Sequence, residues 1–232
     1  MLIRQWQGVP ALLISIDRVI LAAAKLESAN LSYERGNTVY ERGASAQFIY
    51  VVNKGALRRV KPLGGGKQTV LQFLFPGDGF GYELGHRHRD TVQALINTEV
   101  VATRKKALLG VAASNVRFAC LLFAAAAQAV VLAEEQSLLR GLPAVERIAL
   151  FLLEMDARLS KRDRQINLPM NRRDISDYLG LTVETISRIM NELQRTKIVK
   201  FQGERQRQIV IRDKKRLQRL ASDALGFDWW KR

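Results

Sequence analysis

The stretch at residues 171–194, NRRDISDYLGLTVETISRIMNELQ, carries two helical patterns separated by a four-residue break. Apolar residues recur at i, i+3, i+4 and i+7 in the second pattern, which predicts a helix buried on one face. Between the patterns, Gly180 suits the left-handed position that ends a helix, and Thr182 suits the N-cap of the next helix. Two helices joined by a short turn with a glycine form a helix-turn-helix, whose second helix enters the DNA major groove.

The side of the second helix opposite its apolar stripe carries side chains that can read bases. Arginine forms two hydrogen bonds with guanine, glutamate accepts from the cytosine amino group, and a small apolar or hydroxyl group suits the thymine methyl. We therefore predict a half-site with a G·C pair beside thymines, contacted by Val183, Glu184, Ser187 and Arg188. The alternative is that Glu184 only stabilises the helix N-terminus and pairs with Arg188 at i, i+4.

Polar and basic side chains around these positions suit phosphate oxygens. After the second helix, a polar hairpin with Gly203 at its tip is typical of a wing, although a solvated turn could have the same composition. Phosphate contacts add salt-dependent affinity without sequence preference. The residues predicted to make them are Arg172, Arg173, Thr182, Thr185, Asn191, Arg205 and Arg207.

The charge of the chain favours a polyanion as the partner. Lys and Arg number 37 against 22 Asp and Glu, a net charge of +15, and residues 140–232 alone hold 21 basic against 12 acidic residues, or +9. We predict double-stranded DNA and no membrane, because no basic amphipathic anchor or bilayer-length apolar run is present. A nucleoid-like protein that binds DNA by charge alone is an alternative. Without a signal-peptide pattern, the expected location is the cytoplasm.

Residues 31–104 change to short β-type segments punctuated by glycine. Strands are expected at residues 48–52, 70–75 and 99–103, with turns at Pro62, 64–66 and 76–79. Closely spaced strands of this kind predict a sandwich, a barrel or a jelly roll. The glycine run before Lys67 lacks the spacing of a phosphate-binding loop, so we interpret it as a hairpin turn.

A long helix is predicted at residues 115–139, and it is apolar on nearly every side. Its own domain would cover one side and a second copy another, as in a dimerisation helix; a helix wholly buried in its own domain is the alternative. A hinge follows at residues 140–142, before an amphipathic helix that ends near residue 160. The predicted dimer contacts are Phe118, Leu121, Leu122, Ala125, Val131 and Leu132.

Few residues are available for redox, metal or catalytic chemistry. The single cysteine, Cys120, excludes an internal disulfide framework and a four-cysteine metal or iron–sulfur site, and its apolar helix favours packing over redox chemistry. His86 and His88 are the only histidines, in a spacing similar to that of metal-dependent cupin enzymes, which are the enzyme alternative. Because two imidazoles cannot form the three-nitrogen site of a cupin, we predict no catalysis, no metal and no cofactor.

The order of these parts resembles the CRP/FNR superfamily of bacterial transcription regulators, over about residues 31–225. Residues 181–188, LTVETISR, resemble the recognition helix of the FNR/FixK branch, and residues 151–156 and 168–175 are most similar to FixK. The resemblance implies an α+β fold with an N-terminal β-roll of the jelly-roll, cyclic-nucleotide-binding type, a long dimerisation helix and a C-terminal winged helix-turn-helix. The corresponding parts are residues 1–110, with an N-terminal helical extension, 111–140 and 141–232.

The resemblance also implies a homodimeric activator that reads TTGA-type palindromes, with RNA polymerase as its protein partner. Its genes would serve microaerobic or anaerobic respiration, nitrogen fixation or denitrification; a repressor, or a regulator with another effector, stays open. Cyclic-nucleotide-binding relatives have Gly-Glu-Leu and Arg-Ser/Thr-Ala motifs, whereas residues 81–85 here read GYELG and residues 88–91 read HRDT. Asp90 beside the phosphate position would repel that ligand, so no cyclic nucleotide is expected.

Overall fold

The computed structural model describes residues 28–65, 68–83, 85–160, 165–202 and 207–222. The chain divides into two compact units, Met1–Ala133 and Glu134–Arg232, which we call unit 1 and unit 2. The predicted N-terminal helical extension lies outside the described residues.

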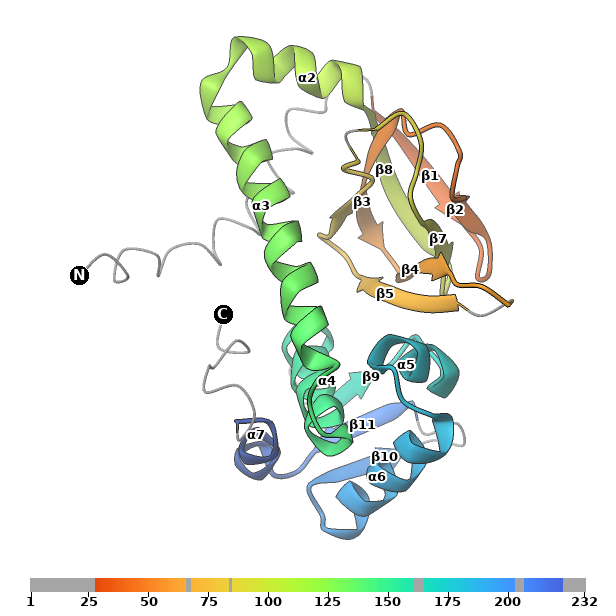
Figure 1. Cartoon of the computed structure of the whole chain (residues 1–232), viewed down its shortest axis with the longest axis vertical. Helices are drawn as coiled ribbons and strands as arrows, with labels where there is room; N and C mark the ends of the chain where they lie inside the picture. The colour runs from red at the N-terminus through yellow and green to blue at the C-terminus, as the bar shows by residue number, and fades with distance from the viewer. Residues whose placement is uncertain (1–27, 66–67, 84, 161–164, 203–206, 223–232) are drawn as a thin grey trace, which may run out of the picture. The chain divides into compact units, whose positions relative to one another are not determined.

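Unit 1 contains a β-roll of two four-stranded sheets with antiparallel pairing (Figure 1). One sheet has the strand order β1-β8-β3-β6, and the other has the order β2-β7-β4-β5. The β-roll predicted from the sequence is therefore confirmed, and the three predicted strands correspond to β3, β5 and β8. The strand bounds are β1 (Ser28–Tyr33), β2 (Thr38–Tyr40), β3 (Phe48–Lys54), β4 (Leu57–Pro62), β5 (Gln68–Leu74), β6 (Gly79–Phe80), β7 (Thr91–Ala94) and β8 (Thr98–Arg104).

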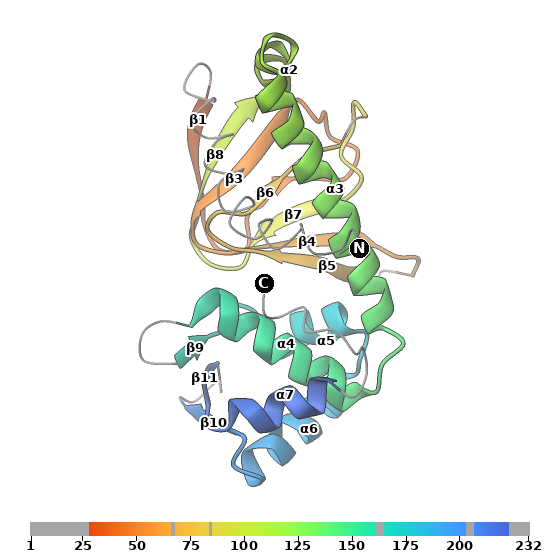
Figure 2. The ribbon, with the colours of Figure 1, turned by 90° about the vertical axis from the view of Figure 1, so that its left-hand side faces the viewer.

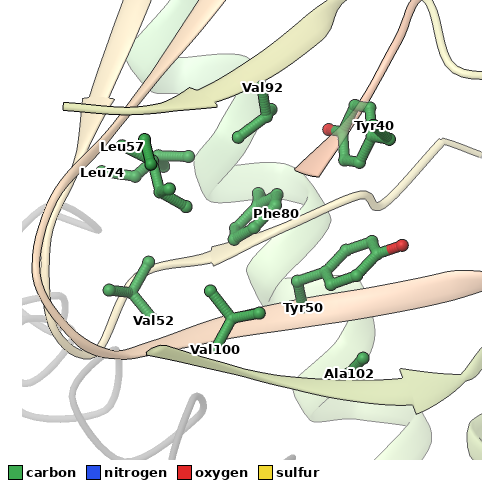
Figure 3. Packing of buried hydrophobic residues seen from close by; sticks show 10 residues of the cluster. Tyr40, Tyr50, Val52, Leu57, Leu74, Phe80, Val92, Val100 and Ala102 are labelled. Atoms are coloured by element: carbon green, nitrogen blue, oxygen red, sulfur yellow. The ribbon is translucent and has the colours of Figure 1, made fainter. Parts of the chain in front are cut away.

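The core of the β-roll lies between the two sheets, because strands direct alternate side chains inward. In β7 and in most of β8, buried residues alternate with half-buried ones. The rings of Tyr50 and Phe80 stack with their centroids 5.0 Å apart. Figure 3 shows this cluster, which contains Tyr40, Tyr50, Val52, Leu57, Leu74, Phe80, Val92, Ala94, Val100 and Ala102.

The hairpin between β4 and β5 differs from the prediction in one detail. Pro62, expected in a turn, is the last residue of β4 and pairs with Gln68 of β5. A proline is tolerated at a strand end because its missing N–H is not required there. Gly65, with a φ of +71°, turns the chain in the predicted glycine run, so the hairpin interpretation of that run is confirmed.

Two helices follow β8, and the first of them and most of the second belong to unit 1. Helix α2 (Lys105–Ser114) was not predicted, because no side chain caps its N-terminus and Gly110 interrupts its pattern. Helix α3 (Val116–Leu139) runs along one side of the β-roll (Figures 1 and 2). Among the helices in the described ranges, none combines the length and the apolarity that crossing a bilayer requires.

Unit 2 is built around α4 (Ala144–Leu159), in which residues 148–153 and Met155 are all buried. Helices α5, α6 and α7 and a three-stranded sheet of order β10-β11-β9 surround it (Figure 2). The predicted helix-turn-helix is confirmed, and the β10–β11 hairpin forms where the wing was predicted, with its expected tip, Gly203, outside the described residues. The remaining bounds are β9 (Gln165–Asn167), α5 (Arg172–Leu179), α6 (Val183–Arg195), β10 (Val199–Gln202), β11 (Gln208–Ile211) and α7 (Lys214–Ser222).

Candidate DNA-binding site

Local hydrogen bonds define both helices of the helix-turn-helix. A capping box begins α5: the Asp174 N–H donates to Asn171 Oδ1, and the Asn171 N–H donates to Asp174 Oδ2, each at 2.9 Å. Gly180 ends α5 in the left-handed conformation with a φ of +64°, and Thr182 caps α6 by accepting from the Thr185 N–H at 3.1 Å. The predicted roles of Gly180 and Thr182 are confirmed. The capping box was missed, although its N-x-x-D spacing is present in the sequence.

Helix α6 has one buried face and one exposed face. Its buried residues are Ile186, Met190 and Leu193, whereas Ile189, predicted in the same stripe, is only half-buried. On the opposite side, Val183, Glu184, Arg188 and Asn191 are exposed and Ser187 is half-buried. The four predicted base-reading residues therefore lie together on one accessible face.

The two charged residues of this face do not pair with each other. The pKa of Glu184 lies below its ordinary value because its carboxylate accepts from its own backbone N–H and from the Thr182 hydroxyl. A carboxylate at a helix N-terminus is also favoured by the helix dipole. Arg188 makes no hydrogen bond or ion pair with any residue that the structure describes. Its guanidinium is therefore available to an external acceptor, and the i, i+4 pair with Glu184, which was the alternative to base reading, does not form.

The predicted phosphate contacts have different surroundings. Arg173 and Asn191 are exposed, and the Thr185 hydroxyl lies 3.1 Å from the Thr182 hydroxyl. Thr182 and Thr185 lie at the N-terminus of α6, Asn191 lies further along α6, and Arg173 lies in α5. The N-terminus of a helix binds phosphates through its free backbone N–H groups.

Arg172, by contrast, is half-buried, with its guanidinium 5.2 Å from the centre of the Phe201 ring. Arg207 is half-buried, and its carbonyl accepts from the Leu168 N–H at 2.9 Å, which links the wing to the segment after β9. Arg205 lies outside the described residues. Of these three arginines, Arg172 thus has an observed packing role within unit 2.

The structure corrects the predicted dimer contacts of α3. Phe118 is only 3% exposed, because it packs with Ile49 and Leu108 inside unit 1. Leu121 and Leu122 are half-buried against the same cluster. The β-roll and α2 therefore cover Phe118, and they cover Leu121 and Leu122 in part. Of the other predicted contacts, Val131 is 36% exposed, and the side chains of Ala125 and Leu132 lie outside the described residues.

A different stripe of α3 is open to solvent. Val116, Phe123 and Val130 are 78%, 77% and 58% exposed, and Cys120 and Ala127 between them are exposed too. The alternative of a wholly buried helix is therefore wrong. Cys120 lies on the side of α3 that the β-roll leaves uncovered, so the packing role predicted for it is not within unit 1. We call these five residues the α3 stripe.

The two histidines do not form a metal site. His88 is 2% exposed, its ring stacks on Tyr40 with centroids 3.5 Å apart, and its Nδ1 lies 3.3 Å from Glu83 Oε1. His86 is exposed, so the two imidazoles do not converge. Among the described residues, no group of three histidine, cysteine or acidic side chains could hold a metal ion.

Asp90, which was predicted to lie beside the phosphate position of a cyclic nucleotide, is buried in the same polar cluster. Its Oδ2 lies 3.1 Å from Arg59 Nε. Burial raises the pKa of Asp90, and the Arg59 guanidinium partly opposes this effect. Burial, together with Glu83, also raises the pKa of Tyr40. The cluster thus consists of the chain's own acidic, basic and aromatic side chains in contact with one another.

Comparison with known proteins identifies both units. Residues 146–220 match the Crp-like helix-turn-helix domain, and residues 30–115 match the cyclic nucleotide-binding domain. The nitrogen fixation regulation protein FixK of Azorhizobium caulinodans is 32% identical, over 82% of this chain and 78% of that protein. FixK of Rhizobium meliloti is also 32% identical, over 82% of this chain and 88% of that protein. This chain belongs to the CRP/FNR family of transcription regulators.

Within the CRP/FNR family, the structural similarity is again to FixK. The structure of FixK2 from Bradyrhizobium japonicum is 41% identical, with a TM-score of 0.80 over 84% of this chain and 98% of that one. The CRP/FNR protein described here is accordingly a FixK-like transcription regulator with a DNA-binding helix-turn-helix. Regulators of this family act as dimers.

Proposed function

We propose that the protein is a cytoplasmic, homodimeric activator that reads TTGA-type palindromes near genes of microaerobic or anaerobic metabolism or nitrogen fixation. The observation that carries this proposal is the exposed face of α6, where Arg188 has no partner among the described residues. The names of relatives support the choice of genes, since two are nitrogen fixation regulation proteins. A third, 28% identical, is the transcriptional activatory protein AadR of Rhodopseudomonas palustris.

Each base-reading residue has a chemical role in this proposal. Arg188 donates two hydrogen bonds to guanine O6 and N7, and Glu184 accepts from the cytosine amino group. Val183 and Ser187 contact thymine methyl groups beside that pair. The Glu184 carboxylate, whose pKa lies below its ordinary value, is ionised at neutral pH and can only accept hydrogen bonds. The phosphate contacts predicted above position α6 without contributing sequence preference.

Replacing Arg188 by Ala tests this reading. The affinity for a TTGA-type palindrome should fall by about 1–3 kcal/mol, and the choice at its G·C pair should relax. The measurement is fluorescence anisotropy of labelled palindromic and scrambled duplexes at near-physiological salt. The matched control is Arg195→Ala, because Arg195 is an exposed arginine of the same helix whose guanidinium is held by Glu192 at 2.7 Å. An equal loss on both duplexes for Arg188→Ala would exclude base reading.

We propose that the α3 stripe forms the dimer interface. Val116, Cys120, Phe123, Ala127 and Val130 recur at alternating spacings of four and three, which is the seam of a two-stranded coiled coil. Burial of this exposed apolar stripe against a second copy provides the driving force. A two-fold axis that runs along the helix pair makes the helices parallel, so that both recognition helices meet one palindrome.

The regulator is proposed to act without a cyclic nucleotide. Asp90, which the family resemblance places beside the expected phosphate position, is held in an ion pair with Arg59. A second anion there would compete with Asp90 for the same guanidinium. Calorimetry with cyclic AMP should detect no binding at physiological concentration, and a micromolar affinity would overturn this part of the proposal.

We propose RNA polymerase as the protein partner, because an activator must contact the polymerase. We propose no catalytic activity for the chain. The proposed division of labour is residues 1–110 as a sensor-like β-roll, 111–140 as the dimerisation helix and hinge, and 141–232 as the DNA-binding part. Transcription in vitro from a promoter with a TTGA palindrome, with purified polymerase, tests the partner directly. A fall in transcript on adding the regulator would assign it as a repressor.

A further inference from the structure

Arg147 of α4 connects two distant segments of unit 2. Its Nε donates to the Leu142 carbonyl at 2.7 Å, and its Nη1 donates to the Leu179 carbonyl at 3.0 Å. Leu142 ends the hinge after α3, and Leu179 is the last residue of α5. Nη1 also lies 3.8 Å from the place that a Cβ on Gly180 would occupy, so the guanidinium lies against the turn of the helix-turn-helix.

The Leu142 carbonyl lies between α3 and α4, outside both helices, whereas the Leu179 carbonyl ends α5. The last carbonyls of an α-helix have no N–H within the helix, and they carry the negative end of its dipole. A cation there is favourable, and hydrogen bonds from a charged donor are stronger than neutral ones. Because the guanidinium is planar and its N–H directions are fixed, the two bonds also determine the distance and angle between their acceptors.

We propose that Arg147 is a positioning residue that holds the helix-turn-helix at a set orientation to the hinge. Because α6 belongs to the helix-turn-helix, Arg147 thereby determines the position of α6 in each subunit relative to its half-site of the palindrome. The inference rests on the proposed reading of a palindrome by a dimer. Arg147 contacts no base in this scheme, because Nε and Nη1 already donate to protein carbonyls.

The spacing preference of the protein tests this role. One inserted base pair moves a half-site by about 3.4 Å and turns it by about 35°. The full-length protein should bind two TTGA half-sites about one helical turn apart better than the same duplex with one base pair added or removed. Arg147→Met, which removes both donors, should reduce that preference at least fivefold, and Arg147→Lys, which keeps one donor and the charge, should lie between.

Two measurements separate positioning from other roles. The slope of log affinity against log salt should stay unchanged for Arg147→Met, whereas loss of a phosphate contact lowers it by about one. Amide hydrogen exchange should accelerate together at Leu142 and Leu181, whose N–H groups donate within the hinge and the helix-turn-helix turn. Exchange at Ile186, buried in α6, should keep its wild-type rate.

Arg158→Met is the matched control, since Arg158 lies on the same helix and pairs with Glu154 one turn away. It should change neither spacing preference nor exchange at the hinge. The inference is overturned if folded Arg147→Met keeps the wild-type spacing preference, if its salt slope falls by about one, or if exchange rises equally throughout unit 2. If the wild-type protein does not prefer the palindrome over scrambled DNA, the proposed function fails, and the exchange measurement alone then decides the role of Arg147.

Discussion

Replacing Phe123 by Ala should weaken the dimer while leaving the fold of the protomer intact. The side chain is 77% exposed in the protomer, so its truncation removes little burial from the chain's own core. Full burial of a phenylalanine is worth about 1.5–3 kcal/mol. With roughly three quarters of each side chain available to the second copy, the pair contributes about 2–5 kcal/mol per dimer. The dimer dissociation constant should therefore rise roughly 30-fold to a few thousand-fold.

Sedimentation equilibrium over a range of protein concentrations measures this constant. The matched control is Ile96→Ala, an exposed apolar residue in the turn between β7 and β8, which should leave the constant unchanged. Thermal unfolding of Phe123→Ala at a concentration where both proteins are monomeric should match the wild type. A dissociation constant within threefold of wild type would refute the assignment of the α3 stripe.

Cys120 reports the register of the same interface. In a parallel, in-register coiled coil, identical seam positions of the two helices face each other. Mild oxidation by copper phenanthroline and oxygen should then join the two Cys120 thiols in an intersubunit disulfide, with their electrons passing to oxygen. A covalent dimer on a non-reducing gel, absent in Cys120→Ser, is the expected result, and an antiparallel pairing would give none.

Three further predictions concern stability. Gly55→Ala should destabilise unit 1 by at least about 2 kcal/mol in urea unfolding, because a Cβ there would lie 2.6 Å from the Thr98 Cα; Gly36→Ala, also at positive φ but in open space, should lose only about 1 kcal/mol. Asn171→Ala should lower the stability of unit 2 by about 1 kcal/mol through loss of its N-cap hydrogen bond, seen as a lower thermal midpoint. Since burial raises the pKa of Asp90 in the folded state, its ionisation opposes folding at neutral pH, and that penalty disappears as the pH falls through the raised pKa. Compared with Asp90→Asn, the wild type should thus gain relative stability in urea unfolding as the pH falls from neutral towards the ordinary pKa of an aspartate, and a constant difference would contradict this sign.

Short-range signals were sufficient to predict the helix-turn-helix and its base-reading face. Gly180 and Thr182 act within one turn of their own positions, and the 3.6-residue period of α6 separates buried Ile186 from exposed Arg188. These preferences are local, so they can be recognised in the sequence without knowledge of the rest of the fold. The strands of the β-roll were recognisable for the same reason, whereas α2 was not, because it depends on Leu108 reaching a core formed elsewhere.

Only the tertiary structure could assign the two faces of α3. This helix is apolar on nearly every side, so its periodicity does not distinguish Phe118, which packs on the β-roll, from Phe123, which is open to a second copy. Arg147 was missed for a related reason: its acceptors, Leu142 and Leu179, are backbone carbonyls, and the second lies 32 positions along the chain. Local sequence patterns therefore identify the helices and their caps. Which face of a helix is covered, and which distant carbonyl a side chain bonds, depends on the packing of segments far apart in the sequence.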